Sequence, residues 1–342
     1  MQQPAVTVLI LNWNGRNWLE QFLPSVQAST YPNLHILLAD NGSSDDSIAW
    51  TQEHFPNVEI AALKENWGFA EGNNRALPYV KTPYVVLLNS DVEVSPAWLE
   101  PLVALAEAKP TLVSVQPKVL AYHQKDQFEY AGASGGYMDR FGYPFCRGRI
   151  FDEVETDKGQ YEEAQQVFWA TGACCLLRTE VVQEIGLFDA RFFAHMEEID
   201  FCWRAQNLGY EVWVEPKSVV WHVGGGTLPQ GNPRKTFLNV RNSLACLYKN
   251  LPAGKRFSRI FTRLILDGVW GVRALTQLDF GTILAILKGH FAFYGWLGYL
   301  RSERKRIYQE QPPRLPLPGW LDQSIVRLHF LKGVKRWEEL KQ

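Results

Sequence analysis

The sequence lacks the two glycine-rich signatures with which many proteins bind phosphate groups. Neither a GxxxxGK[ST] pattern nor a GxGxxG pattern occurs in its 342 residues. Because both patterns form loops whose backbone surrounds phosphates, their absence excludes a P-loop and a dinucleotide-binding loop. If the protein binds a nucleotide, a metal ion held by acidic side chains could replace the glycine loop.

The protein also has little net charge and few cysteines. The formal net charge is −1 and no long basic block occurs, which argues against a dedicated nucleic-acid-binding protein. The five cysteines are an odd number, and Cys174 and Cys175 are adjacent, so a disulfide framework is not expected. We expect these two to be small core residues in a reducing compartment. No basic residue precedes the first apolar run, so it does not resemble a secretory signal.

No window of about 18 to 20 residues is both apolar and free of charge, so a membrane-spanning helix is not expected. Residues 256–306 nevertheless interleave aromatic and basic side chains and end in Arg301, Arg304, Lys305 and Arg306. This pattern favours helices that lie on an anionic membrane surface. The alternative is a pair of packed helices with a solvated basic end.

The first hundred residues alternate apolar strand patterns with helical patterns. Four strands are expected, at 6–11, 34–39, 58–63 and 84–88, and 46% hydrophobic residues can cover them on both faces. Near-continuous apolar strands separated by helices predict a parallel sheet in an α/β fold. Each strand runs into a polar cluster, and ligands of such sheets bind at the carboxyl ends of the strands.

The fourth strand ends in Asn89-Ser90-Asp91-Val92-Glu93. These residue types are common in turns, and a turn is one explanation. Asp91 and Glu93 are two residues apart, however, so one chain reversal can direct both carboxylates at a common point. A hard divalent cation prefers such oxygens and keeps phosphate oxygens and water as its other ligands.

A second acidic group, Glu197, Glu198 and Asp200, opens a helical pattern that ends at Gly209. Acids in a first helical turn are favoured by the helix dipole, which is the structural explanation. Three acids within four residues also repel one another, and that repulsion raises the proton affinity of at least one of them. A carboxylate of this kind is suited to take a proton from an alcohol.

Seven motifs follow one another between residue 6 and about residue 227. They are NWNG, ADNGSSDDS, ENWGFAEGNN, LLNSDVEV, ATGACCLLR, GLFDARFFAHMEEIDFCWRAQNLGY and WHVGGGT. In this order they resemble family two of the inverting, metal-dependent glycosyltransferases, near the bacterial rhamnosyltransferases. The resemblance implies a glycosyltransferase A-type domain over 1–227, with a nucleotide-sugar half (1–120) and an acceptor half (121–227). A helical C-terminal region, 228–342, would follow.

The resemblance also implies roles for individual residues. Donor binding is expected at Asn12, Asp40, Asn66, Gly68, Phe69, Asn73, Asn89 and Asp91, with Asp40 bonding a pyrimidine base. Acceptor binding is expected at Thr171, Gly172, Trp203, Arg204 and Arg241. A divalent cation, Mg²⁺ or Mn²⁺, would be bound by Asp91, His222 and Glu93. Because Asn89 stands where the family usually has an acid, Asp91 would carry most of the metal binding.

By the same resemblance Glu198 is the catalytic base, with Glu197 and Asp200 as alternatives. The implied reaction transfers a sugar, with inversion, from a nucleoside diphosphate sugar to a hydroxyl of a glycan or lipid-linked glycan. We expect dTDP-rhamnose as donor, or else a UDP-hexose, in bacterial surface polysaccharide synthesis. The expected location is the cytoplasmic face of the inner membrane. A nucleotide-sugar binder without turnover and a sugar nucleotidyltransferase are the alternatives.

Overall fold

The computed structural model describes residues 3–224 and 231–341. Its main sheet contains the four predicted strands in parallel, in the spatial order β4-β1-β2-β3. Their bounds are β1 (Val6–Asn12), β2 (Leu34–Asp40), β3 (Glu59–Ala62) and β4 (Tyr84–Asn89). Asn12 lies directly beside Asp40 in the β1–β2 register, so the polar ends of these strands meet at one edge of the sheet.

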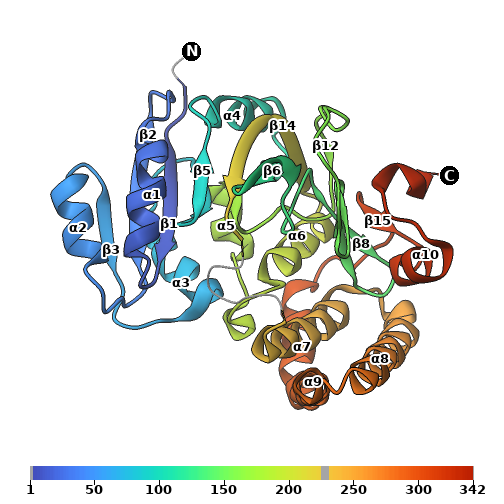
Figure 1. The fold of residues 1–342 in the computed structure, drawn as a ribbon. Helices are drawn as coiled ribbons and strands as arrows, with labels where there is room; N and C mark the ends of the chain where they lie inside the picture. The colour runs from blue at the N-terminus through green and yellow to red at the C-terminus, as the bar shows by residue number, and fades with distance from the viewer. Residues whose placement is uncertain (1–2, 225–230, 342) are drawn as a thin grey trace.

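The second half of the chain extends this sheet beyond β4. Strand β13 runs antiparallel to β4, and the next strands outward are β6 and then β14, which are parallel to each other. The added strands are β5 (Val92–Val94), β6 (Leu112–Ala121), β7 (Gln124–Phe128), β12 (Gln165–Gln166), β13 (Cys174–Arg178) and β14 (Glu211–His222). Both predicted halves therefore share one continuous sheet (Figure 1).

Helices cover both faces of this sheet because its strands are apolar on both sides. In β1, Val8 and Ile10 point into one hydrophobic cluster and Leu9 into the other, as the two-residue repeat of a strand requires. The helices are α1 (Arg16–Gln27), α2 (Ser47–His54), α3 (Gly68–Ala76), α4 (Leu99–Ala108), α5 (Thr179–Ile185) and α6 (Glu197–Asn207). Helices α1 and α4 contribute to the cluster of Val8, and α3, α5 and α6 to that of Leu9.

A second, small sheet was not predicted from the sequence. Its strands are β8 (Gly136–Asp139), β9 (Pro144–Cys146), β10 (Arg149–Ile150), β11 (Glu153–Val154) and β15 (Trp320–Leu321). Strand β15 comes from the C-terminal segment and pairs in parallel with β8. Gly319 packs so closely on Phe168 that a Cβ atom would lie 2.2 Å from its backbone nitrogen. The C-terminal segment is therefore packed onto the acceptor half.

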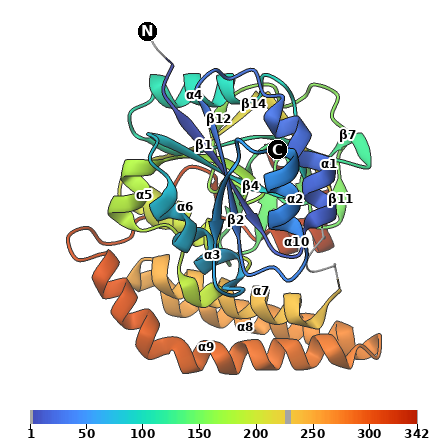
Figure 2. The same ribbon diagram turned by 90° about the vertical axis from the view of Figure 1, so that its left-hand side faces the viewer.

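Three long helices follow the sheet domain: α7 (Pro233–Asn250), α8 (Ala253–Thr276) and α9 (Phe280–Ile307). Figures 1 and 2 show them gathered on one side of the molecule, below the sheet. Helix α7 is buried between α6 and α9, while α8 and α9 have one outward face each. A short helix α10 (Ile325–Lys332) and a turn of 3-10 helix, η3 (Trp337–Lys341), end the described chain.

By length and composition, α9 is the one candidate for a membrane-spanning helix in the described parts of the chain. The mean hydropathy of its most apolar window is 1.2, and 28% of that window is buried inside the protein. The buried side of α9, which includes Ala285, Ile286 and Gly289, faces the protein, and Gly289 packs against Val240 of α7. In this structure α9 therefore lies along the catalytic domain.

Candidate active site

The carboxyl ends of β1 and β2 form a buried polar pair. Asn12 Nδ2 donates to Asp40 Oδ1 at 3.1 Å and to Ser43 Oγ at 3.3 Å. Asp40 Oδ2 accepts from the backbone nitrogen of Ser43 at 2.9 Å. Asn12 Oδ1 is buried and has no hydrogen-bond partner among the described residues. Asp40, which is expected to bind the pyrimidine of the donor, thus lies at the sheet edge. Hydrogen bonds from Asn12 and from the backbone of Ser43 hold its carboxylate in place.

The next polar group surrounds the start of α3. Asn66 Oδ1 accepts from the backbone nitrogen of Gly68 at 2.9 Å, and Asn73 Nδ2 donates to the carbonyl of Phe69 at 2.9 Å. Asn41, which was not predicted, joins this turn to β2: its Nδ2 donates to the carbonyl of Gly68 at 3.0 Å. Its position directly after Asp40, at the end of β2, is the feature of the sequence that could have identified Asn41 as a site residue. The expected donor residues of this segment are thus brought together.

A third group joins the end of β4 to the end of β14. Nε2 of His222 lies 3.3 Å from Asp91 Oδ1 and 3.5 Å from Nδ2 of Asn89, and Nδ1 lies 3.5 Å from Glu129 Oε2. Burial alone would lower the pKa of His222, but the Asp91 and Glu129 carboxylates raise that pKa to about 10. Glu129 is a further unpredicted residue, and nothing in its local sequence distinguishes it.

Glu93 is not part of this group. On β5 it lies opposite Trp221, whereas Val92 lies opposite His222, so Glu93 and His222 point to different faces. Its carboxylate is bonded to Lys125 Nζ at 2.8 Å and 2.9 Å. The structure therefore corrects the expectation that Asp91 and Glu93 point to one site. Asp91 lies in the turn before β5 and contacts His222, whereas Glu93 lies within β5 and is bonded to Lys125.

The donor types of Asp91 and His222 fit a divalent cation. A carboxylate oxygen and an imidazole nitrogen, here 3.3 Å apart, are both recognised ligands of Mn²⁺-type ions, and a bound cation would take the place of the proton on Nε2. Within the described residues no group of three or more His, Cys, Asp and Glu side chains is arranged to hold a metal ion. A cation at this position would complete its shell with phosphate oxygens and water.

The predicted base, Glu198, lies near Gly172 and Phe69. Gly172 separates Glu198 from the donor side: a Cβ on Gly172 would lie 3.3 Å from the ring of Phe69 and 3.8 Å from the Cβ of Glu198. The next residue, Ala173, accepts through its carbonyl from the backbone nitrogen of Asn89 at 2.9 Å. Glu198 is partly exposed and its Oε2 has no hydrogen-bond partner among the described residues. The Cβ of Glu198 and the ring of Phe69 thus both lie close to Gly172.

Burial changes the proton affinity of the two neighbouring glutamates. It raises the pKa of Glu198 to about 7, although backbone N–H groups at the start of α6 oppose the shift. It also raises the pKa of Glu197 well above its usual value, and the nearby Glu198 adds to this rise. The carboxyl of Glu198 therefore titrates near neutrality, as a general base requires.

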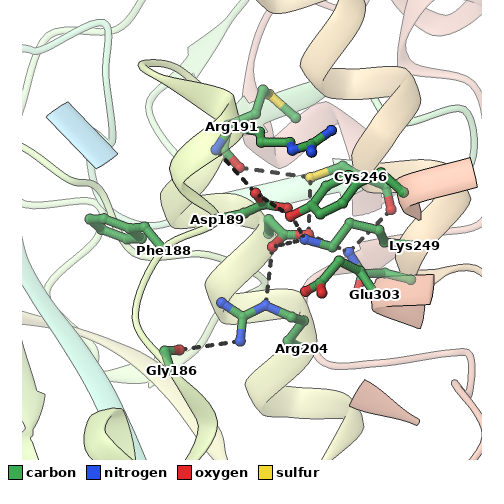
Figure 3. A network of polar contacts seen from close by, with 12 residues as sticks. Gly186, Phe188, Asp189, Arg191, Arg204, Cys246, Lys249 and Glu303 are labelled. Carbon is green, nitrogen blue, oxygen red and sulfur yellow. Dashed lines mark hydrogen bonds and ion pairs between the residues drawn. The ribbon is translucent and has the colours of Figure 1, made fainter. Parts of the chain in front are cut away.

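Asp200, the third acid, is in a different environment. Its side chain is fully buried, and its oxygens accept from Lys249 Nζ at 2.9 Å, Arg204 Nε at 3.0 Å and Asn250 Nδ2 at 2.8 Å. Lys249 Nζ also lies 2.8 Å from Asp189 Oδ2 (Figure 3). Although burial alone would raise the pKa of Asp200, Lys249 and Arg204 lower it. The structure thus argues against Asp200 as the catalytic base, because three donors already occupy its carboxylate oxygens.

Three of the expected acceptor residues contact other parts of the protein through ring packing or hydrogen bonds. Trp203 is buried against Phe168 and Trp320. Arg204 donates to Asp200 and to the carbonyls of Ile185, Gly186 and Leu187. Arg241 donates to the carbonyls of Arg191 and Phe192. The helical repeat could not distinguish the buried side of α6 from the side of Glu198, which explains the outcome for Trp203 and Arg204, while Arg241 lies on α7.

The other two expected acceptor residues lie in the turn before β13. Gly172 lies beside Phe69 and Glu198, as described above. Thr171 is buried beside it, and its Oγ1 accepts from the backbone nitrogen of Ala173 at 3.2 Å. Thr171 therefore shapes the turn that carries Gly172.

The chain is similar to proteins of a known family. The family model described as "Glycosyl transferase family 2" matches residues 7–186, more than half of the chain. The chain belongs to this family. It is thus a glycosyltransferase, and the recognition based on the seven motifs is confirmed.

Two curated relatives of this family 2 chain are named for rhamnosyl transfer and for O-antigen biosynthesis. An N-acetylglucosaminyl-diphospho-decaprenol L-rhamnosyltransferase from Mycobacterium tuberculosis is 27% identical over 65% of this chain and 78% of the relative. The O-antigen biosynthesis protein RfbC of Myxococcus xanthus is 27% identical over 61% of this chain, which corresponds to 16% of that longer protein.

Solved structures support the fold of this family 2 glycosyltransferase. GalNAc-T7, crystallised with UDP, GalNAc and Mn²⁺, has a TM-score of 0.60 at 15% identity and covers 91% of this chain and 58% of its own. A mannosyltransferase from Pyrobaculum calidifontis, in complex with GDP-Man and Mn²⁺, has a TM-score of 0.50 at 16% identity and covers 91% and 89%. The predicted glycosyltransferase A-type α/β fold is confirmed.

A stability prediction for this family 2 enzyme follows from the environment of Asp200. Asp200→Ala leaves Lys249 and Arg204 buried without their shared carboxylate, and breaking such a pair typically costs about 3–5 kcal/mol. We expect a fall of this size in the free energy of unfolding, measured by urea denaturation. Glu180→Gln, at an exposed acid on α5, should change it by less than about 0.5 kcal/mol. Equal effects of the two substitutions would contradict the role given to Asp200.

Proposed function

We propose that this glycosyltransferase transfers a sugar, with inversion, from a pyrimidine nucleoside diphosphate sugar to a hydroxyl of a glycan or lipid-linked glycan. The observation that carries the proposal is the position of Glu198: its Cβ lies beside Gly172, which also contacts Phe69, and its Oε2 has no hydrogen-bond partner among the described residues. A base beside the donor-binding residues, with a pKa near 7, is what deprotonation of an acceptor hydroxyl needs.

In the proposed reaction, Glu198 accepts the proton of the acceptor hydroxyl. The acceptor oxygen then bonds to the anomeric carbon on the face opposite the diphosphate. The bond from that carbon to the diphosphate oxygen breaks, and its electron pair leaves with the nucleoside diphosphate, so the configuration inverts once. Asp91 and His222 would hold a divalent cation, Mg²⁺ or Mn²⁺, which when bound neutralises the diphosphate.

The donor sugar is proposed from the relatives. dTDP-rhamnose is the first choice, because the Mycobacterium tuberculosis relative is named an L-rhamnosyltransferase. A UDP-hexose is the second, because the GalNAc-T7 structure contains UDP. The acceptor belongs to a bacterial surface polysaccharide, as the names of the M. tuberculosis and Myxococcus xanthus relatives suggest.

We also propose that the enzyme binds the cytoplasmic face of the inner membrane through α8 and α9. Helix α8 has its charged side turned inward: Arg263 and Asp267 are buried and bond at 2.9 Å. Its outward side is apolar instead, and so is that of α9. Ten of the exposed apolar residues are Phe257, Phe261, Ile265, Val269, Val272, Phe280, Leu284, Leu287, Phe291 and Tyr294. We call these ten residues the apolar face.

Exposed basic residues occur on the same helices, at Lys255, Arg273, Lys288, Arg301, Lys305 and Arg306. A surface helix in water normally shows the reverse arrangement, with charges outside and apolar residues inside. Apolar side chains flanked by basic ones match the chemistry of anionic lipid, whose acyl region takes the former and whose head groups attract the latter. We therefore favour a membrane as the partner of the apolar face.

The base is tested by its pH dependence. Because Glu198 must be ionised to accept a proton, we expect turnover to fall as the pH decreases through about 7 rather than through its usual range near 4.5. Glu198→Gln should lower turnover by at least about 100-fold and leave donor binding intact. Glu197→Gln is the comparison, and a large loss there alone would move the assignment by one residue. Unchanged turnover in both variants would refute the proposed base.

The metal site is tested by its ligands. Asp91→Ala should reduce transfer by at least about 100-fold and weaken binding of the nucleoside diphosphate, and EDTA should reproduce both effects. Glu93→Ala should retain Mn²⁺ binding, measured by electron paramagnetic resonance, since Glu93 is bonded to Lys125 instead. Full activity in EDTA with no metal retained would exclude the metal.

Membrane binding is tested with liposomes containing anionic lipid. The protein should sediment with them at low ionic strength and be released by salt or alkaline carbonate. Phe261→Asp with Phe291→Asp should weaken binding by more than about 10-fold, because burial of each phenylalanine is worth about 1.5–3 kcal/mol. Tyr79→Asp, at an exposed aromatic residue outside these helices, should not. Dimerisation through the apolar face without liposome binding would contradict the proposal.

A further inference from the structure

The loop that precedes the catalytic helix has an unusual backbone. Phe193, His195 and Met196 have φ angles of 66°, 70° and 72°, which place three non-glycine residues in the left-handed region. Each such residue is disfavoured, so the surrounding structure must hold the loop in this shape. Glu197 and Glu198 follow directly, and the position of their side chains depends on this shape. We refer to residues 193–196 as the strained loop.

One side of the strained loop contacts the donor-binding helix α3. The carbonyl of Phe193 accepts from the backbone nitrogens of Phe69 at 2.8 Å and Ala70 at 3.1 Å. The ring of Phe193 packs against Gly68, where a Cβ atom would lie only 2.6 Å from it. Because these bonds satisfy free N–H groups in the first turn of α3, the loop fixes that helix relative to α6.

The other side of the strained loop is held by one amide on α7. Asn242 is fully buried, and its Nδ2 lies 3.1 Å, 3.0 Å and 2.7 Å from the carbonyl oxygens of Phe192, Ala194 and His195, to which it donates. Two hydrogens are thus shared among three carbonyls. Asn242 Oδ1 accepts from Arg241 Nε at 2.9 Å, which fixes the orientation of the amide.

We propose that Asn242 is a positioning residue for sugar transfer. By fixing the strained loop from the α7 side, it sets the distance between Glu198 and the donor bound at α3. The proposal rests on the assignment of Glu198 as the base. Asn242 touches neither substrate, so its removal should change turnover and leave binding of the nucleoside diphosphate almost unchanged.

A purely structural role for Asn242 makes a different prediction, and Asn207 provides the matched control. Asn207 is an equally buried amide at the far end of α6: its Nδ2 donates to Tyr308 Oη at 3.0 Å and its Oδ1 accepts from the backbone nitrogen of Arg314 at 3.0 Å. It has no hydrogen bond to the strained loop. Asn207→Ala and Asn242→Ala should therefore lower the melting temperature by similar amounts and differ in turnover.

The experiment measures kcat, the Kd of the nucleoside diphosphate and the melting temperature for the full chain. A misplacement of about 1 Å at reacting groups costs up to about 100-fold in rate, so we expect Asn242→Ala to lower kcat by about 10- to 100-fold. Its Kd should stay within about 3-fold, a change of less than 1 kcal/mol. Alanine is the better helix former, so loss of α7 would not explain the effect.

Two further variants complete the test. Asn242→Asp keeps the shape of the side chain but directs an acceptor oxygen at three carbonyls, so its kcat should fall at least as far. If Asn242→Ala does not fold, Asn242→Ser, which has a single hydroxyl donor, should show the same separation of kcat from Kd. Equal kcat values in the Asn242→Ala and Asn207→Ala enzymes would overturn the positioning role alone. Near-native turnover in Glu198→Gln would overturn it together with the base.

Discussion

The buried carboxylate of Asp200 fixes the relation between the two parts of this molecule. It lies on the helix that starts with Glu198, and it bonds Lys249 and Asn250 of α7. Two cations and an amide compensate for its removal from water, because a buried charge is tolerated only when it is fully paired. The acid pair at the start of α6 is therefore positioned by the same helix that carries Asn242. The C-terminal region contributes directly to the geometry of the candidate active site.

Much of the donor side could be predicted because its signals are local. A parallel strand is a short apolar run, and its polar end identifies the ligand-binding edge without knowledge of any distant contact. Asn12, Asp40, Asn66 and Asp91 lie at or near this edge for that reason. Glu93 does not, because the side-chain direction in β5 depends on how β5 pairs with β14.

The acceptor side was harder to predict because its geometry depends on contacts that are distant in sequence. In the acidic start of α6, Glu198 lies beside Gly172 while Asp200 is paired with α7, and both are acids in one helical turn. Trp203 and Arg204 are buried by the C-terminal segment and by residues 185–187. Glu129 gave no local signal, since its contact exists only once β14 lies beside it. The pair Arg241-Asn242 resembles a pair in the family's helix, but the bonds of Asn242 to the strained loop depend on a contact that is distant in sequence.

The five cysteines are free and buried. Burial raises the pKa of all five thiols, so none is a reactive thiolate near neutral pH. The native enzyme should therefore be almost silent toward maleimides, and a single cysteine introduced on the apolar face would be the dominant site of labelling. A polarity-sensitive fluorophore or a spin label attached there would report the depth and orientation of α8 and α9 without removal of any native residue.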